Sequence, residues 1–134
     1  MKPSPLSLPW LALLLFALSC TKRPYKVETK FIAGYLIGKE TCHPDPDNDY
    51  WLLDCTVHPN TPSIGDTIVV DNETYTNVIK VKGLLPELQE LGTSIGIEYK
   101  TITREKVETT GCEVPSPVTY HLKEIFIIHQ GIAR

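Results

Sequence analysis

The chain has 134 residues, 42% of them hydrophobic and 22% charged, with 13 Lys and Arg against 16 Asp and Glu. The resulting net charge of −3 excludes the strongly basic surface that nucleic-acid-binding domains use, so we expect no nucleic-acid partner. The hydrophobic content argues against a disordered chain, and the length suits one domain with a modest core of its own.

The first twenty residues have the layout of a secretory signal. Lys2 gives a short basic start, and an uncharged run follows from Leu8 to Leu18. Small residues, Ala17 and Ser19, then lie directly before Cys20. This apolar run is shorter than the roughly 20 residues that a membrane-spanning helix needs, and a small-residue cleavage site is typical of a signal peptide.

The segment Phe16-Ala17-Leu18-Ser19-Cys20 resembles the lipobox of bacterial lipoproteins. Ala17 stands where the commonest lipobox has Leu, and this relaxed form is similar to that of Bacteroidota. The resemblance implies cleavage before Cys20, which would then carry a thioether-linked diacylglycerol and an amide-linked acyl chain. Several acyl chains together give stable membrane attachment. The alternative is simple secretion, because Ala17 and Ser19 also suit ordinary signal peptidase cleavage.

The lipobox divides the chain into a signal peptide (1–19), a lipidated tether (20–25) and a single β-barrel domain (26–134). No Asp and no acidic run follows Cys20. By resemblance to lipoprotein sorting patterns, this implies the cell envelope, at the periplasmic face of the outer membrane. The membrane is then the first partner, held through the lipid on Cys20.

Four cysteines are present, and lipidation of Cys20 leaves Cys42, Cys55 and Cys112. An odd number of thiols in an oxidising compartment suggests one disulfide and one thiol left over. Cys42 and Cys112 lie in turn-rich stretches, whereas Cys55 ends a strand-like run. We favour a Cys42–Cys112 disulfide with Cys55 as a buried free thiol. A local Cys42–Cys55 pair remains open, and without the lipid all four cysteines could pair.

Alternation of hydrophobic and polar residues predicts strands, and clusters of Pro, Gly, Asn and Asp predict the loops between them. A short helix is expected between Pro86 and Gly92, which suit its first position and its stop. The sequence Asp71-Asn72-Glu73 suits a hairpin turn, and Gly34 suggests a bend or a close backbone approach. The expected strands cover residues 26–39, 50–57, 67–70, 74–81, 95–101 and 118–132.

This order of elements resembles an OB-fold by topology, because the first strand is long and bent and a helix separates the third and fourth main strands. The expected fold is mainly β. It is a small five- to six-stranded OB-like barrel, or a curled antiparallel sheet, with one short helix between strands. A closed barrel would remove the exposed strand edges that invite aggregation.

Alternating carboxylates at Asp45, Asp47 and Asp49 are the kind of oxygen ligands that calcium prefers. The EF-hand pattern, however, needs Gly where this chain has Tyr50 and Glu where it has Thr56. We therefore expect a solvated acidic turn and no metal.

Cys42-His43 and the Cys55-x-x-His58 spacing contain zinc-ligating residue types, but the oxidising compartment favours disulfides over thiolate ligands. We expect no zinc and no other cofactor. The alternative function is a secreted or periplasmic enzyme that uses a metal site or a Cys–His pair, with Cys55 beside His58 or His129.

OB-like barrels often bind oligosaccharides or peptides on one sheet face. Tyr35, Trp51, Tyr75 and Tyr99 are the candidate residues of such a binding face, and the alternative is that about half of them are core residues. The leading expectation is a non-enzymatic binding or structural lipoprotein, with another envelope protein or a glycan as its partner.

Overall fold

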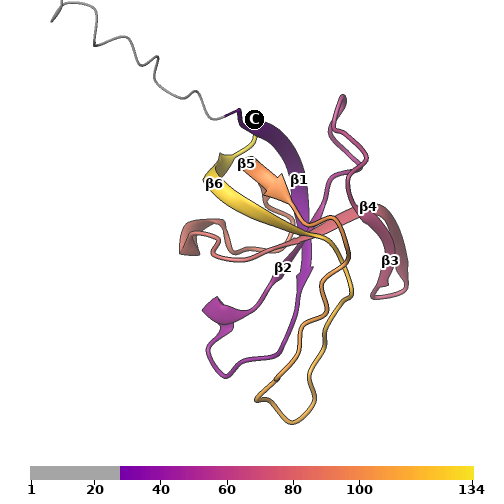
Figure 1. Cartoon of the computed structure of the whole chain (residues 1–134), viewed down its shortest axis with the longest axis vertical. Helices are drawn as coiled ribbons and strands as arrows, with labels where there is room; N and C mark the ends of the chain where they lie inside the picture. Colours follow the sequence, from indigo (N-terminus) through magenta and orange to yellow (C-terminus); the bar gives the residue numbers. More distant parts are fainter. Residues whose placement is uncertain (1–27) are drawn as a thin grey trace, which may run out of the picture.

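The computed structural model of the protein describes residues 28–134, in which six strands and two short 3-10 turns are present (Figure 1). The predicted signal peptide, Cys20 and the tether lie outside these residues. Within residues 28–134 no helix is both long enough and apolar enough to cross a bilayer. The elements are β1 (Lys30–Lys39), η1 (Pro46–Asn48), β2 (Trp51–Asp54), β3 (Asp66–Val70), β4 (Glu73–Val81), η2 (Pro86–Leu88), β5 (Ser94–Ile102) and β6 (Glu124–Ile132).

Five of these strands close into a hydrogen-bonded ring, in the order β1-β2-β4-β6-β5 and back to β1. Only the short β4–β6 contact is parallel, with Lys80 and Val81 opposite Glu124 and Ile125. Strand β3 lies outside the ring and pairs with β4 as a hairpin. The predicted OB-like barrel is therefore confirmed, and its sheet is mixed rather than purely antiparallel.

Two predicted backbone features are also correct. Asp71 and Asn72 have positive φ values of 50° and 66°, which a two-residue type I′ hairpin turn requires at both central positions. At Gly34, a Cβ atom would lie 2.5 Å from the carbonyl oxygen of Asp54. Only glycine therefore allows β1 to approach β2 this closely.

The expected helix is reduced to the single 3-10 turn η2, which ends close to the positive-φ residue Gly92. Leu84 and Leu88 are buried, but Leu85 and Leu91 are 44% and 63% exposed. Because only two of these leucines reach the core, one turn is enough to bury them, and a short segment does not recover the cost of nucleating an α-helix.

The last strand begins at Glu124, later than predicted. The residues before it leave the sheet and form isolated bridges instead. Val118 pairs with Thr41, and Leu122 pairs with Val107. A polar connection between β5 and β6 therefore folds back on itself and onto the loop that follows β1.

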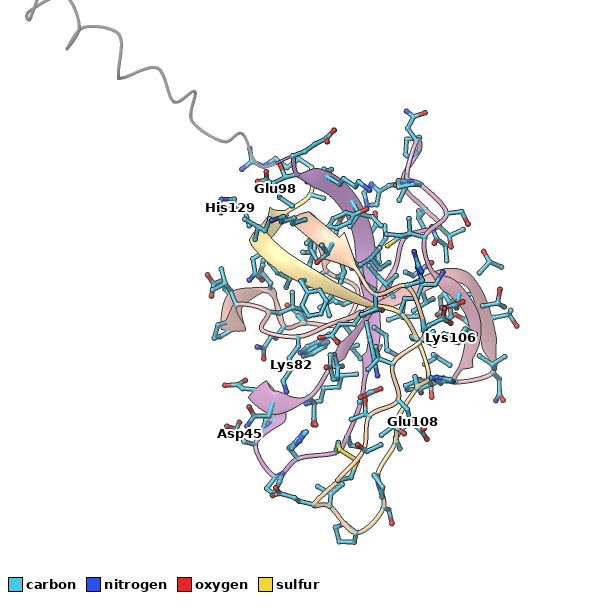
Figure 2. All side chains as sticks on the ribbon, in the orientation of Figure 1. Asp45, Lys82, Glu98, Lys106, Glu108 and His129 are labelled. Carbon is cyan, nitrogen blue, oxygen red and sulfur yellow. A yellow bond between two sulfur atoms is a disulfide. The ribbon has the colours of Figure 1, made fainter. Side chains whose placement is uncertain are left out.

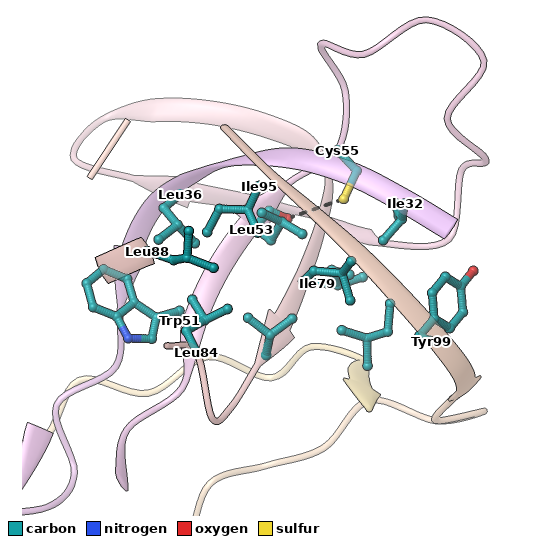
Figure 3. Packing of buried hydrophobic residues seen from close by; sticks show 13 residues of the cluster. Ile32, Leu36, Trp51, Leu53, Cys55, Ile79, Leu84, Leu88, Ile95 and Tyr99 are labelled. Carbon is teal, nitrogen blue, oxygen red and sulfur yellow. Dashed lines mark hydrogen bonds between the residues drawn. The ribbon is translucent and has the colours of Figure 1, made fainter. Parts of the chain in front are cut away.

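The interior of the ring holds the main core, shown in Figure 3. It consists of side chains that point inward from all five ring strands, together with two leucines next to η2. Burial of aliphatic side chains of this size stabilises the fold by roughly 1.5–3 kcal/mol each. The buried members are Ile32, Leu36, Trp51, Leu53, Cys55, Ile79, Val81, Leu84, Leu88, Ile95, Ile97, Tyr99 and Ile125.

A second, smaller core lies on the outside of β2 and β4. Its buried members are Leu52, Val70, Val78 and Leu122, which come from three strands and from the connection before β6. Tyr75 packs against it while partly buried. The outer face of β2 and β4 is thus covered by the chain itself.

Candidate functional site

In OB-like barrels, ligands bind on the face of the second and third ring strands, between the loops that follow the first and fourth ring strands. In this protein those strands are β2 and β4. The two loops are residues 40–50, called the front loop below, and residues 103–123, called the arm.

The front loop and the arm are fastened together. Cys42 and Cys112 form a disulfide with an S–S distance of 2.07 Å, which is the pairing favoured from the sequence (Figure 2). Thr41 and Val118 exchange backbone hydrogen bonds of 2.9 and 3.0 Å. Glu113 donates a third backbone hydrogen bond, of 2.8 Å, to the Cys42 carbonyl oxygen.

A buried ion pair joins the same two segments to the barrel. Lys80 on β4 donates to Glu40 at 3.3 Å, to the Thr109 hydroxyl at 2.8 Å and to the Tyr120 carbonyl oxygen at 3.1 Å. Glu40 in turn accepts hydrogen bonds from the Thr109 hydroxyl and the Tyr120 backbone amide. Lys80 Nζ also lies 4.6 Å from the centre of the Tyr50 ring. Every charge in this cluster therefore has partners.

These contacts close the face that an OB-like barrel would offer to a ligand. Leu52 and Val78 point outward from β2 and β4, yet both have 0% exposure because the β3 hairpin and the arm cover them. This face of the barrel is therefore covered by the chain itself.

The four predicted aromatic residues do not form one binding face. Trp51 and Tyr99 are 7% and 2% exposed and belong to the core inside the ring, because their strand positions point inward. Lys39 Nζ lies over the Trp51 ring, 5.6 Å from its centre. Tyr75 packs on the second core, whereas Tyr35 stacks on His58 with ring centres 5.3 Å apart.

Cys55, the nucleophile of the predicted enzyme alternative, is the free and buried thiol that the sequence indicated. Its Sγ donates to the Leu53 carbonyl oxygen at 3.8 Å inside the barrel (Figure 3). Burial, and secondly the negative charge of Asp54, raise the pKa of this thiol. A thiol held neutral and away from solvent is a poor nucleophile, so Cys55 acts as a core residue.

The carboxylates of the front loop are engaged by the loop itself. Asp45 caps η1 by accepting from the Asp47 amide at 3.1 Å. Asp49 is 3% exposed and accepts from the backbone amides of Cys42 and His43 at 3.0 Å each. In the part of the chain that the structure describes, no three His, Cys, Asp or Glu side chains are grouped as metal ligands.

An open groove of about 830 Å³ lies on the outer face of β1, β5 and β6. The loop of residues 58–61 forms one side, and the start of β1 and the end of β6 lie together at one end. Figure 1 shows the marked C-terminus beside the beginning of β1. The groove is therefore on the opposite side of the ring from the covered β2–β4 face.

The floor of the groove is a row of three small residues. Ala33 on β1 lies opposite Gly96 on β5, and Gly96 lies opposite Gly131 on β6. Directly opposed residues share a face of the sheet. Ala33 and Gly96 are buried, so the row is partly exposed only at Gly131. A Cβ atom at Gly131 would meet nothing within 4 Å. We call this row the shelf.

The next row along the three strands consists of Phe31, Glu98 and His129, which are also directly opposed. Glu98 and His129 are labelled near the beginning of β1 in Figure 2. The Thr29 hydroxyl donates to the Glu98 carboxylate. Phe31 leans over the shelf, because a Cβ atom at Gly96 would lie 2.8 Å from its Cζ atom, yet its side chain is 63% exposed.

His58 forms the other wall. Its ring stacks on Tyr35 at an interplanar angle of 15°, and its Nε2 lies 3.1 Å from the Ser94 hydroxyl oxygen. Ser94 lies opposite Tyr35 across the β1–β5 pair. The stacking and the hydrogen bond together fix the orientation of the imidazole beside the shelf.

Lys30, Glu98 and Arg134 also border the groove. Lys30 lies opposite the inward-pointing Tyr99, so its side chain leaves β1 on the other face of the sheet. The groove therefore combines a floor that is open at Gly131, an exposed aromatic ring and fixed polar groups.

Comparison of the chain with protein-family models, with curated proteins and with solved structures finds no match. The function must therefore be argued from the residues of the site.

Proposed function

We propose that the protein is a lipid-anchored, non-enzymatic binding module of the cell envelope, and that its ligand lies in the groove on β1, β5 and β6. The observation that carries the proposal is the groove itself, about 830 Å³ in volume, in which the exposed Phe31 ring, the fixed imidazole of His58 and the open backbone at Gly131 come together. Glycine inside a strand weakens the strand and often marks a place where a ligand approaches the backbone closely.

The lipobox supports the lipid anchor. An anchor at Cys20 would also limit the distance between the groove and the membrane. Only eight residues separate Cys20 from Thr29, which lines the groove. Such a segment spans at most about 30 Å when fully extended. A lipid on Cys20 would hold the groove close to a membrane surface, and the sorting signals imply the periplasmic face of the outer membrane.

One observation favours a second candidate, a hydrolase that uses Ser94 as nucleophile and His58 as base. Their 3.1 Å contact borders the groove and has the spacing of an activated nucleophile. No carboxylate of residues 28–134 is hydrogen-bonded to His58, whose ring rests on Tyr35 instead. The pair lacks the third group that orients the base in a triad, so binding is the favoured function.

The anchor is tested by the intact mass of the protein extracted from membranes, measured without reduction. We expect the mass of residues 20–134 plus acyl chains, with Cys55 as the one thiol alkylated after unfolding. The Cys20→Ser variant is the control and should lose the acyl mass and leave the membrane. A wild-type chain without acyl mass would contradict the lipid anchor.

The binding site is tested in cells with a photo-crosslinking amino acid placed at Thr61, on the loop that forms one side of the groove. The matched control places it at Thr101, an exposed residue of β5 that does not line the groove. We expect an adduct at 61 that is missing at 101. Identical adducts at both positions would contradict a ligand site in the groove.

The hydrolase candidate is tested with the Ser94→Ala variant. If the protein binds without catalysis, this variant should form the same adduct through position 61. A covalent ester on Ser94 of the wild-type protein, absent from Ser94→Ala, would instead support the enzyme.

A further inference from the structure

We propose that the arm is a lid over the outer face of β2 and β4, and that reduction of the Cys42–Cys112 disulfide opens this lid while the barrel stays closed. The first argument is the low burial of the arm, because Leu122 is the only buried residue of the segment 103–123. A segment that buries so little apolar surface has a low free energy of local opening. Covalent attachment therefore contributes much of what holds the arm in place.

The disulfide acts at the middle of the arm. The arm continues into β5 at one end and into β6 at the other, and Cys112 attaches its centre to Cys42 of the front loop. The other contacts near this point are hydrogen bonds, such as the backbone pair of Thr41 and Val118. Each contributes only about 0.5–1.5 kcal/mol, since water offers competing hydrogen bonds. Reduction therefore removes the strongest contact at the centre of the arm.

Opening of the arm would leave no buried charge without its counter-charge. Lys80 lies on β4 and Glu40 is the first residue of the front loop, so the 3.3 Å ion pair stays together when the arm leaves. The arm gives this pair only neutral partners, which are the Thr109 hydroxyl and the backbone of Tyr120. Water can take the place of these partners once the arm has moved away.

The main core of the barrel is independent of the arm. Among residues 28–134, the buried members of this core come from the ring strands, from Cys55 and from the leucines next to η2, and none comes from the arm. The second core does depend on the arm, because Leu122 packs there against Leu52 and Val78. Both of these residues have 0% exposure in the oxidised protein. An open arm would therefore uncover part of the β2–β4 face and leave the interior of the ring closed.

The reductant is a protein dithiol, which supplies two electrons and two protons. One of its thiolates attacks Sγ of Cys112, which is partly exposed, whereas Cys42 has 0% exposure. The S–S bond breaks, and Cys42 leaves as a thiolate that takes up a proton. The second thiolate of the reductant then displaces Cys112 from the mixed disulfide. Cys112 takes up the second proton, and the reductant departs as a disulfide.

Two buried residues serve as reporters in the test of this lid. Lys80 has 0% exposure beneath the arm, so an amine reagent reaches it when the arm opens. Cys55 is buried inside the ring, so iodoacetamide reaches it when the barrel opens. The folded protein is treated with dithiothreitol at pH 8, and then with acetyl N-hydroxysuccinimide ester or with iodoacetamide. Peptide masses assign each modified residue, and Lys100, an exposed residue of β5, is the amine control.

Reduction should make Cys42 and Cys112 react with iodoacetamide and should raise the rate of Lys80 acetylation about tenfold or more. The rate at Lys100 should stay within about twofold of its value in the oxidised protein, because this residue is exposed in both states. Cys55 should remain unmodified.

Three results would overturn the lid. The first is a disulfide that dithiothreitol does not reduce in the folded protein. The second is an unchanged rate of Lys80 acetylation after reduction, which would show that the arm stays closed. The third is alkylation of Cys55 as fast as that of Cys112, which would show that the whole barrel opens.

The Thr109→Val variant separates the disulfide from the hydrogen bonds of the arm. In its oxidised form it keeps the disulfide but lacks the hydroxyl that bonds to Lys80 and Glu40. Lys80 should stay as unreactive in this variant as in the oxidised wild type. Acetylation as fast as in the reduced wild type would show that the hydrogen bonds, and not the disulfide, hold the arm closed.

Discussion

Lys80 and Glu40 form an ion pair inside the protein, with Nζ 3.3 Å from Oε1 and 0% exposure of both side chains. Lys80 comes from β4, Glu40 is the first residue of the front loop, and Thr109 of the arm bonds to both. The pair therefore holds three segments that are distant in sequence. Because both charges are fully partnered, removal of either one would leave the other buried without its counter-charge.

The Lys80→Met variant should lower the free energy of unfolding by about 3–5 kcal/mol, because Glu40 would remain buried and unpaired. The measurement is denaturant unfolding with the disulfide intact. The matched control is Lys106→Met, since Lys106 forms a 3.5 Å ion pair with Asp66 at the surface. Its loss should cost less than about 1 kcal/mol. Similar losses in both variants would show that burial does not decide the strength of the pair.

Replacing Cys42 and Cys112 by Ser should lower the free energy of unfolding by about 4 kcal/mol, because the disulfide closes a loop of 70 residues. The expected cost comes mainly from the greater freedom of the unfolded chain. The arm should also exchange its amide hydrogens faster than the barrel in this variant. Equal acceleration in the arm and in β1 would mean that the disulfide stabilises the whole barrel rather than fastening the arm.

Two glycines of the barrel, Gly34 on β1 and Gly131 on β6, should respond differently to the same substitution. Gly34→Ala should destabilise the protein by about 1–3 kcal/mol, since its Cβ would lie 2.5 Å from the Asp54 carbonyl oxygen. Gly131→Ala should be close to neutral, because its Cβ would meet nothing within 4 Å. Thermal unfolding of the two variants measures the difference. A larger loss in Gly131→Ala would contradict the geometry of the groove floor.

The Cys55 thiol should resist iodoacetamide at pH 8 in the folded protein and react fully after unfolding. Burial and the nearby charge of Asp54 raise its pKa, so the thiolate that reacts is not populated in the fold. Mass spectrometry before and after denaturation gives the result. Rapid alkylation of the native protein would show that Cys55 is accessible and reactive, and would again make it a candidate nucleophile.

Stability should fall between pH 10 and 12. Burial, together with the negative charge of Glu124, raises the pKa of Tyr50 from 10.0 to about 12. Below pH 10 this phenol is neutral in both the folded and the unfolded states, and the full stability is present. Above pH 10 the unfolded chain ionises first, so stability is lost as the pH approaches 12.

Denaturant unfolding at pH 9 and pH 11 measures this loss. The Tyr50→Phe variant should show a smaller fall, with the remainder due in part to Tyr75 and Tyr99, whose pKa values are also raised. If stability falls as much in Tyr50→Phe as in the wild type between pH 9 and pH 11, groups other than Tyr50 cause the loss.

The barrel was predictable from the sequence because strand alternation and turn residues are local signals. The hairpin at Asp71 and Asn72 is an example, since its positive φ values follow from the residue types. The helix prediction was wrong because Pro86 and Gly92 mark where a helix can begin and end, but do not show how many of the nearby leucines reach the core. Here only Leu84 and Leu88 do so.

The groove was not predictable in the same way. Gly96 and Gly131 each interrupt a strand pattern, but their meaning depends on their lying opposite each other in the β5–β6 register. Register between strands this distant in sequence cannot be read from alternation alone. The expected aromatic binding face was wrong for a related reason. Trp51 and Tyr99 point into the barrel, and the sequence alone does not tell which side of each strand the barrel encloses.

The way in which β1 divides its pairing has a mechanical consequence. Its first half, Lys30–Tyr35, is hydrogen-bonded to β5, and its second half, Tyr35–Lys39, is bonded to β2. A force applied to the chain at residue 28, along the direction of β1, would act in shear on the backbone hydrogen bonds to both β5 and β2. These hydrogen bonds would then have to break together rather than one after another. A protein held at its N-terminal end could thus carry a load from its ligand while the barrel stays closed.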